Sequence, residues 1–337
     1  IIRKSAIPTT PLPVRSAWQD SQFPNTATST GKSRIFTFWQ MFFVSIASLL
    51  KPIMDTTKIA WILSMAFCQS TLILLLGILL QTTIPMTIPE LRIKALHDTA
   101  SDVSQFVNSY FQTSNFTISS KKDGSEVTTV DIEAELMARQ VLLEAFPDDG
   151  FLGEEHGEVI GSNGYRWVVD PIDGTASFAR NVPLFGTLIG LEYEGVPIAG
   201  IASLPALGET ISAVVGEGVR YQGSKSEGVS SVATLEDAMI CTTSYDYYKQ
   251  TNTEPLYQKL LEANGSIRGW SDCYAYMLLC TGQIDAVIEP LLLPWDIVPW
   301  LPIIEEAGGK YSPIASGGIA SNHNLHNALC HALSCTP

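Results

Sequence analysis

The stretch Trp167-Val168-Val169-Asp170-Pro171-Ile172-Asp173-Gly174-Thr175 decides the fold. The apolar and β-branched residues from Tyr165 to Val169 predict a short buried strand. Pro171 removes a backbone N–H donor, and Asp173-Gly174 is typical of a turn. Two carboxylates therefore leave the end of a strand with a backbone carbonyl between them, and such hard oxygen ligands suit Mg²⁺. Taken alone, the same residues also fit a Pro-Asp-Gly turn on the surface.

Three further acidic segments accompany this stretch, at Lys122–Asp131, Gly153–Glu158 and Pro294–Gly309. Taken singly, each has a structural explanation. Asp131 would complement a helix dipole, Glu154 would lie in a solvated turn, and Asp296 would cap a helix. Their joint presence, rather than any one of them, favours a single acidic site.

Composition narrows the class of function. The chain has 337 residues, 46% of them hydrophobic, and a formal net charge of -14. Residues 1–89 hold seven Lys or Arg and two acids, so the acidity lies in the remainder. An acidic body of this kind is a poor nucleic-acid binder, because phosphate backbones attract Lys and Arg. Six cysteines without a CxxC pair, and histidines without an HExxH motif, disfavour zinc chemistry.

The first 87 residues read as an extension that precedes the domain. Residues 1–35 are rich in Ser, Thr and Pro and predict disorder or a targeting sequence. Residues 59–80 carry no charge over a length that can cross a bilayer. This segment is a membrane anchor, a signal or plastid leader, or an upstream extension absent from the mature protein. The first two alternatives predict a plastid or membrane location, and the third a cytoplasmic one.

The remainder, 88–337, predicts one α/β domain. Apolar spacing favours helices over Leu91–Phe111 and Asp131–Phe146, the second with Ile132, Leu136, Val141 and Leu142 toward the core. Strands are expected at 165–169, 185–193, 197–203 and 209–215. Helices are expected at 273–280, 297–307 and 324–333, with Gly308-Gly309 ending the second of these.

The order Gly-Glu-Glu, Asp-Pro-Ile-Asp-Gly-Thr, then Trp-Asp with a trailing Glu-Ala-Gly-Gly resembles the inositol monophosphatase superfamily over Glu90–Leu333. The resemblance implies an α/β fold, a layered αβαβα sandwich that is typically a homodimer. It implies hydrolysis of a small-molecule phosphate with two or three Mg²⁺ ions. The ligands it implies are Glu154, Asp170, the Ile172 carbonyl, Asp173 and Asp296.

The same resemblance assigns roles beyond the metals. Asp131 and Thr175, with Glu154, resemble the residues that activate the attacking water. The amides around Gly174 and Thr175 are expected to hold phosphate oxygens. Asp173 and Asp296 are expected to contact the substrate as well.

Substrate choice depends on the segment Arg268-Gly269-Trp270-Ser271-Asp272-Cys273-Tyr274. It resembles the R-x-W-G-D-C-Y pattern of the histidinol-phosphate phosphatases of this superfamily, which implies substrate contacts from Arg268 and Asp272. A carboxylate there would pair with the ammonium group of histidinol phosphate, which inositol lacks. The chain departs from this pattern at Ser271, and the 310–318 segment looks shortened. Asp272 is alternatively a simple helix cap.

Two other functions stay open from the sequence. The first is an inositol-1-monophosphatase, or a broad inositol-phosphate phosphatase, with the same metal chemistry. The second is a membrane-tethered pseudo-phosphatase that binds partners without catalysis. The complete set of acids argues against the second, because a degenerate site usually loses at least one of them.

Overall fold

The computed structural model describes residues 88–334 apart from 123, 264–265 and 271. The predicted leader, the apolar stretch 59–80 and Ser271 therefore lie outside the described residues. In the part that is described, no helix has the length and apolar character needed to cross a membrane. The chain from Ile88 onward forms one compact unit, and the nature of residues 1–87 stays a prediction.

The larger of the two main sheets has eight strands and is antiparallel except between β3 and β5. All four strands expected from the sequence are present in it. Its strands in spatial order are β10 (Ser224–Lys225), β9 (Gly218–Tyr221), β8 (Glu209–Val214), β7 (Val196–Leu204), β6 (Gly186–Tyr193), β5 (Tyr165–Asp173), β3 (Gly150–Gly153) and β4 (Gly157–Val159).

A five-stranded sheet follows in the sequence, and it mixes parallel and antiparallel pairs. Its strands in spatial order are β12 (Ile267–Arg268), β11 (Ile240–Thr242), β13 (Ala286–Glu289), β15 (Gly317–Asn322) and β14 (Gly309–Ile314). A small separate hairpin pairs β1 (Ile118–Ser120) with β2 (Glu126–Thr128). The segment 310–318, which looked shortened, forms most of β14 and the start of β15.

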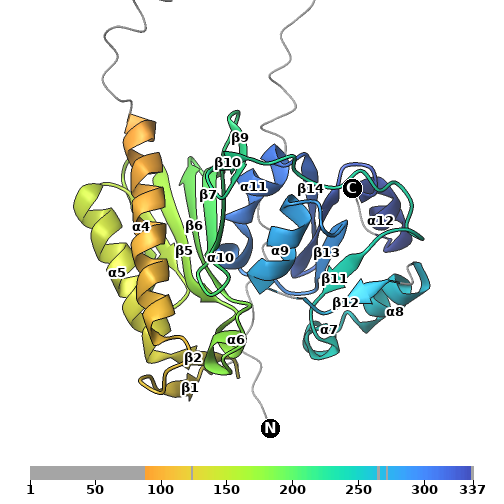
Figure 1. The fold of residues 1–337 in the computed structure, drawn as a ribbon, viewed down its shortest axis with the longest axis horizontal. Coiled ribbons are helices and arrows are strands. Elements are labelled where there is room, and N and C mark those ends of the chain that lie inside the picture. The colour runs from red at the N-terminus through yellow and green to blue at the C-terminus, as the bar shows by residue number, and fades with distance from the viewer. Residues whose placement is uncertain (1–87, 123, 264–265, 271, 335–337) are drawn as a thin grey trace, which may run out of the picture. The chain divides into compact units, whose positions relative to one another are not determined.

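Helices fill the three layers around the two sheets, as Figure 1 shows. The outer face of the large sheet carries α4 (Ile88–Tyr110) and α5 (Thr129–Ala145). Between the sheets lie α9 (Asp272–Cys280), α10 (Pro294–Ile297) and α11 (Trp300–Glu306). The far face of the small sheet carries α8 (Glu254–Ala263) and α12 (His326–Ala332). Two further short helices are α6 (Thr175–Ala179) and α7 (Tyr245–Thr251). The helix layers and the two sheets form an αβαβα sandwich, which confirms the predicted fold.

The buried face of α5 differs from the one predicted. Ile132, Leu136 and Val141 are between 42% and 51% exposed, and only Leu142 of the four expected residues is buried. The helix instead packs through residues four apart, Val130, Ala134, Ala138 and Leu142. Two alanines on this face let the helix approach the sheet closely. The prediction relied on hydrophobicity and therefore placed the large side chains in the core. The buried face of the helix holds the small alanines instead.

The helix predicted over 297–307 is broken into two. It is interrupted at Val298 and Pro299, between α10 and α11. Pro299 has no N–H for a helical hydrogen bond, which accounts for the break. Gly308 follows α11 with a φ of 82°, as expected of a glycine that ends a helix.

Candidate active site

The end of β5 places two carboxylates where the strand leaves regular pairing. The strand was expected to stop at Val169 but runs to Asp173, with a register shift against β6 between Asp170 and Asp173. The Ile172 N–H donates to Asp170 Oδ1 at 3.0 Å. The Thr187 hydroxyl donates to the Pro171 carbonyl at 2.9 Å. Pro171 thus prevents continuous pairing, and side chains hold the irregular backbone.

Gly174 makes the turn from β5 into α6 possible. Its φ is 92°, a left-handed conformation that glycine adopts without strain. A Cβ atom there would also lie 2.8 Å from the Leu184 carbonyl oxygen. The turn places Thr175 at the first position of α6, beside the two carboxylates.

Asp131 and Thr175 are joined by a hydrogen bond, as their predicted partnership requires. The Thr175 hydroxyl lies 2.8 Å from Asp131 Oδ1 and 3.0 Å from the Ile172 carbonyl oxygen. Asp131 also forms a capping box with Thr128 at the start of α5, so its helix-terminal role and its site position coexist. Burial raises the pKa of Asp131, although hydrogen bonds from Thr128 and Thr175 oppose the rise.

The turn after β3 carries Glu154 and Glu155 and is held from two sides. Glu135, a fully buried residue of α5, accepts hydrogen bonds from the backbone N–H groups of Glu155 and His156, both at 2.7 Å. The Lys121 ammonium lies 2.6 Å from Glu154 Oε1 and 2.6 Å from Glu155 Oε1. Neither support was predicted from the sequence, because Lys121 and Glu135 lie far from this turn along the chain.

Mutual repulsion shows which acids the fold brings together. Burial raises the pKa of Asp170 well above its usual value, and the charges of Glu154, Asp173 and Asp296 raise it further. Burial raises the pKa of Asp296 to about 7, and the charges of Glu154 and Asp272 add to the rise. The Leu293 N–H donates to Asp296 at 2.7 Å and opposes it. The four predicted acidic ligands therefore lie within electrostatic range of one another.

Two further acids adjoin this cluster on the side of the small sheet. Burial raises the pKa of Asp173 well above its usual value, and Asp272 is the charge that adds most to the rise. Asp272 starts α9 with a φ of 58°. Glu289, at the end of β13, is buried, and its Oε1 atom has no hydrogen-bond partner among the described residues. Burial, then Asp272 and Asp296, raises the pKa of Glu289 well above its usual value.

Glu289 was missed in the sequence, and Arg268 does not contact the cluster in the structure. An available signal for Glu289 was its position after the apolar run Ala286–Ile288, seven residues before Asp296. Arg268 is exposed on β12 and donates to the Ile267 carbonyl at 2.9 Å, and no ion pair is seen between it and these acids among the described residues. The substrate role predicted for Arg268 stays a prediction.

The acidic residues of the site offer only oxygen donors to a metal ion. Among the described residues, no three or more His, Cys, Asp or Glu side chains converge tightly enough to form a ready metal group. Several of these acids instead take partners within the chain, such as Lys121 for Glu154 and the Leu293 N–H for Asp296. The donors are nevertheless all oxygen atoms, and their carboxylates are buried or half-buried and repel one another. A hard divalent cation prefers such ligands and would neutralise this repulsion. The residues present therefore fit Mg²⁺.

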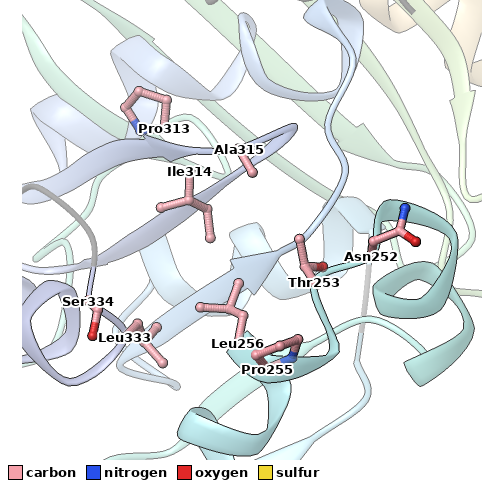
Figure 2. Close-up of a pocket in the computed structure, with 9 residues that line it drawn as sticks. All are labelled: Asn252, Thr253, Pro255, Leu256, Pro313, Ile314, Ala315, Leu333 and Ser334. Atoms are coloured by element: carbon pink, nitrogen blue, oxygen red, sulfur yellow. The ribbon is translucent and has the colours of Figure 1, made fainter.

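A pocket elsewhere on the domain has no acidic side chain in its lining. It measures about 440 Å³ and lies between the segment joining α7 to α8 and the tip of the β14–β15 hairpin. Figure 2 shows its lining, which includes Thr253, Leu256 and Ile314 and holds no ionisable side chain. None of the predicted site residues lines it.

The chain matches the sequence model of the Inositol monophosphatase family over residues 89–334. The chain belongs to the inositol monophosphatase family. This is a family of phosphatases that act on small-molecule phosphates and are generally Mg²⁺-dependent. The resemblance stated from the acidic motifs is thereby confirmed.

Relatives within the family carry two different names. A histidinol-phosphatase from Chlorobaculum parvum is 39% identical over 64% of this chain and 85% of its own length. One from Mycobacterium tuberculosis is 32% identical over 71% of this chain and 95% of its own. An inositol-1-monophosphatase from Rhizobium meliloti is 32% identical over 64% of this chain and 85% of its own.

A solved structure agrees in fold. The inositol monophosphatase from Zymomonas mobilis is 30% identical, with a TM-score of 0.65 over 74% of this chain and 99% of that one. In that protein a flexible region lies at the active site.

Proposed function

We propose that this chain is a Mg²⁺-dependent phosphomonoesterase that hydrolyses L-histidinol phosphate to L-histidinol and phosphate. The observation that carries the substrate assignment is that Asp272, at the start of α9, lies within electrostatic range of Asp173 and Glu289. These extra carboxylates lie next to the predicted ligands and suit a cationic leaving group. Histidinol phosphate has an ammonium group that a carboxylate can attract, whereas inositol phosphate has no such group. The histidinol-phosphatases among the relatives support the same choice.

The chain's own residues account for the proton chemistry. Two or three Mg²⁺ ions, held by Glu154, Asp170, the Ile172 carbonyl, Asp173 and Asp296, would neutralise phosphate charge and lower the pKa of water. The Thr175 hydroxyl donates to Asp131. Its oxygen lone pairs thus remain available to accept a hydrogen bond from the attacking water.

Asp131 completes this proton path. Its burial raises its pKa, which makes it a better proton acceptor than an exposed aspartate. We propose that it takes up the proton of the attacking water through this hydrogen-bonded pair, and that Glu154 also helps to activate this water. The amides of Gly174 and Thr175 are proposed to bind phosphate oxygens.

The test compares two substrates on the full chain. We expect kcat/KM for L-histidinol phosphate to exceed that for inositol 1-phosphate by about tenfold or more, the equivalent of about 1.4 kcal/mol. Activity should vanish with EDTA and return with Mg²⁺. A clear preference for inositol 1-phosphate would favour the inositol-1-monophosphatase alternative. Activity that survives EDTA would contradict the metal dependence.

Assembly and location stay predictions. We propose a homodimer, as the family resemblance implies, and light scattering of the purified chain tests it. A plastid or membrane location is proposed if residues 59–80 serve as leader or anchor, and a cytoplasmic one otherwise. Mass spectrometry of the native amino terminus distinguishes these cases.

A further inference from the structure

The ammonium group of Lys121 contacts two carboxylates of the acidic site, Glu154 and Glu155. Its ammonium bonds Glu154 and Glu155 at 2.6 Å each, and its side chain is only 21% exposed. The Glu155 side chain is 8% exposed. Burial lowers the pKa of Lys121, but the two carboxylates more than reverse this and raise it above its usual value. The ion pair is therefore partly shielded from solvent, where charge pairing is stronger than at the surface.

The backbone around Lys121 fixes this arrangement. The Lys121 N–H donates to the Ser125 carbonyl at 2.8 Å, and the Gly124 N–H donates to the Lys121 carbonyl at 3.1 Å. These bonds close the turn between β1 and β2. From the opposite side, Glu135 holds the backbone of Glu155. The lysine and the glutamate pair are thus positioned independently, from two different elements.

Lys121 and a divalent cation compete for the negative charge of the Glu154 carboxylate. Its Oε1 atom, which accepts from Lys121, belongs to the carboxylate that is the predicted ligand. The ammonium also repels an approaching cation, because both are positive. Any gain in Lys121 pairing is therefore a loss in metal affinity, and this coupling is reciprocal.

We propose that Lys121 is the internal counter-cation of the metal-free site, which holds Glu154 and Glu155 and which a divalent cation must displace from Glu154. The proposal rests on the proposed metal dependence. Lys121 is thus a positioning residue for the acids and a competitor that weakens metal binding. The β1 strand beside it is exposed along its whole length, so the hairpin has room to adjust when the ammonium leaves.

The test measures Mg²⁺ binding by calorimetry on the full chain without substrate, together with the melting temperature of the metal-free protein. Lys121→Met should bind Mg²⁺ more tightly by at least about fivefold, the lower end of typical coupling between sites. Its metal-free form should melt at a lower temperature, because Glu154 and Glu155 then repel each other unpaired. Lys121→Gln should change both quantities in the same directions and serves if the methionine variant does not fold.

The matched control is Lys122→Met, which removes the same charge one residue away from an exposed side chain. It should change the Mg²⁺ dissociation constant by less than about twofold, as expected of a surface charge. Unchanged or weaker Mg²⁺ binding in both Lys121 variants would overturn the proposal while leaving the proposed function standing. Absence of Mg²⁺ binding in the unmodified chain would overturn both.

Discussion

Asp173 occupies an electrostatically crowded position of the site. It is half-buried, and Asp272, Asp296, Glu154 and Glu289 all raise its pKa. Such a group destabilises the metal-free fold, because each buried negative charge adds repulsion that solvent does not screen. Function and stability therefore oppose each other at this residue.

Asp173→Asn should separate the two effects. The variant keeps the shape of the side chain, removes one charge and weakens the donor set. We expect kcat/KM to fall by more than about a hundredfold, beyond the loss typical of a residue that only supports a metal ligand. The metal-free protein should melt at a higher temperature than the unmodified chain. Turnover within twofold of the unmodified chain would contradict the ligand assignment.

Glu135 connects the helix face that bears Asp131 with the turn that bears Glu154. A Cβ atom at Gly153 would lie 2.3 Å from its carboxyl carbon, so the strand and the carboxylate are packed against each other. Glu135→Gln should lower the free energy of unfolding by about 1–3 kcal/mol, because one oxygen acceptor becomes a donor facing an N–H group.

Chemical denaturation and Mg²⁺ calorimetry check the Glu135 prediction. Mg²⁺ affinity should fall by roughly tenfold to a hundredfold, as for other residues that orient ligands. Glu144→Gln is the control, because Glu144 is an exposed residue of the same helix that accepts only from Gln140. Equal effects of the two substitutions would contradict a positioning role for Glu135.

The site residues that belong to short sequence motifs could be predicted from the sequence. Asp170 and Asp173 lie at the end of β5 and Thr175 follows it, so a single motif revealed them. Lys121 and Glu135 were missed because each acts on a turn that lies far along the chain. Only the folded arrangement shows that their side chains reach Glu154 and Glu155.

Among the elements, the small sheet and α12 are joined by one buried histidine. His326 of α12 lies 2.9 Å from the Ser312 hydroxyl of β14 and 2.9 Å from the Ser321 hydroxyl of β15. Burial, with Lys310 and His323 nearby, lowers its pKa from 6.5 to about 4. The folded protein therefore keeps this imidazole neutral at a pH where an unfolded chain protonates it.

Stability should fall on acidification for this reason. Between pH 6.5 and pH 4 the unfolded chain binds more protons at His326 than the folded chain, so the free energy of unfolding decreases as the pH falls. Urea denaturation of the unmodified chain and of His326→Gln, at pH 7 and pH 4.5, checks this. The stability advantage of the unmodified chain should shrink at pH 4.5. A difference that is independent of pH would show that His326 does not titrate in this window.

Element prediction failed where packing outweighed local pattern. The strands of the large sheet were found because their apolar runs and turns are local signals. The face of α5 was assigned to its largest side chains, whereas Ala134 and Ala138 make the close contact. The order of strands in the small sheet was not predicted, because β11 pairs with β12 and β13 across intervening helices.

At the scale of the whole molecule, the site lies where both sheets contribute. The large sheet supplies Asp170 and Asp173 at the end of β5, and the small sheet supplies Glu289 at the end of β13. The helices between them supply Asp272 and Asp296. We therefore expect residues of the large sheet to bind the phosphate and residues of the small sheet to contact the leaving group.

The Asp272→Asn variant tests this account most directly. Asparagine tolerates the positive φ of this position and removes only the charge. Phosphate release from L-histidinol phosphate and from inositol 1-phosphate would be measured for the unmodified chain and the variant. We expect kcat/KM for histidinol phosphate to fall by about tenfold or more, with less than about a threefold change for inositol 1-phosphate, which has no ammonium to lose its partner. Equal losses with both substrates, or no loss with histidinol phosphate, would contradict the account.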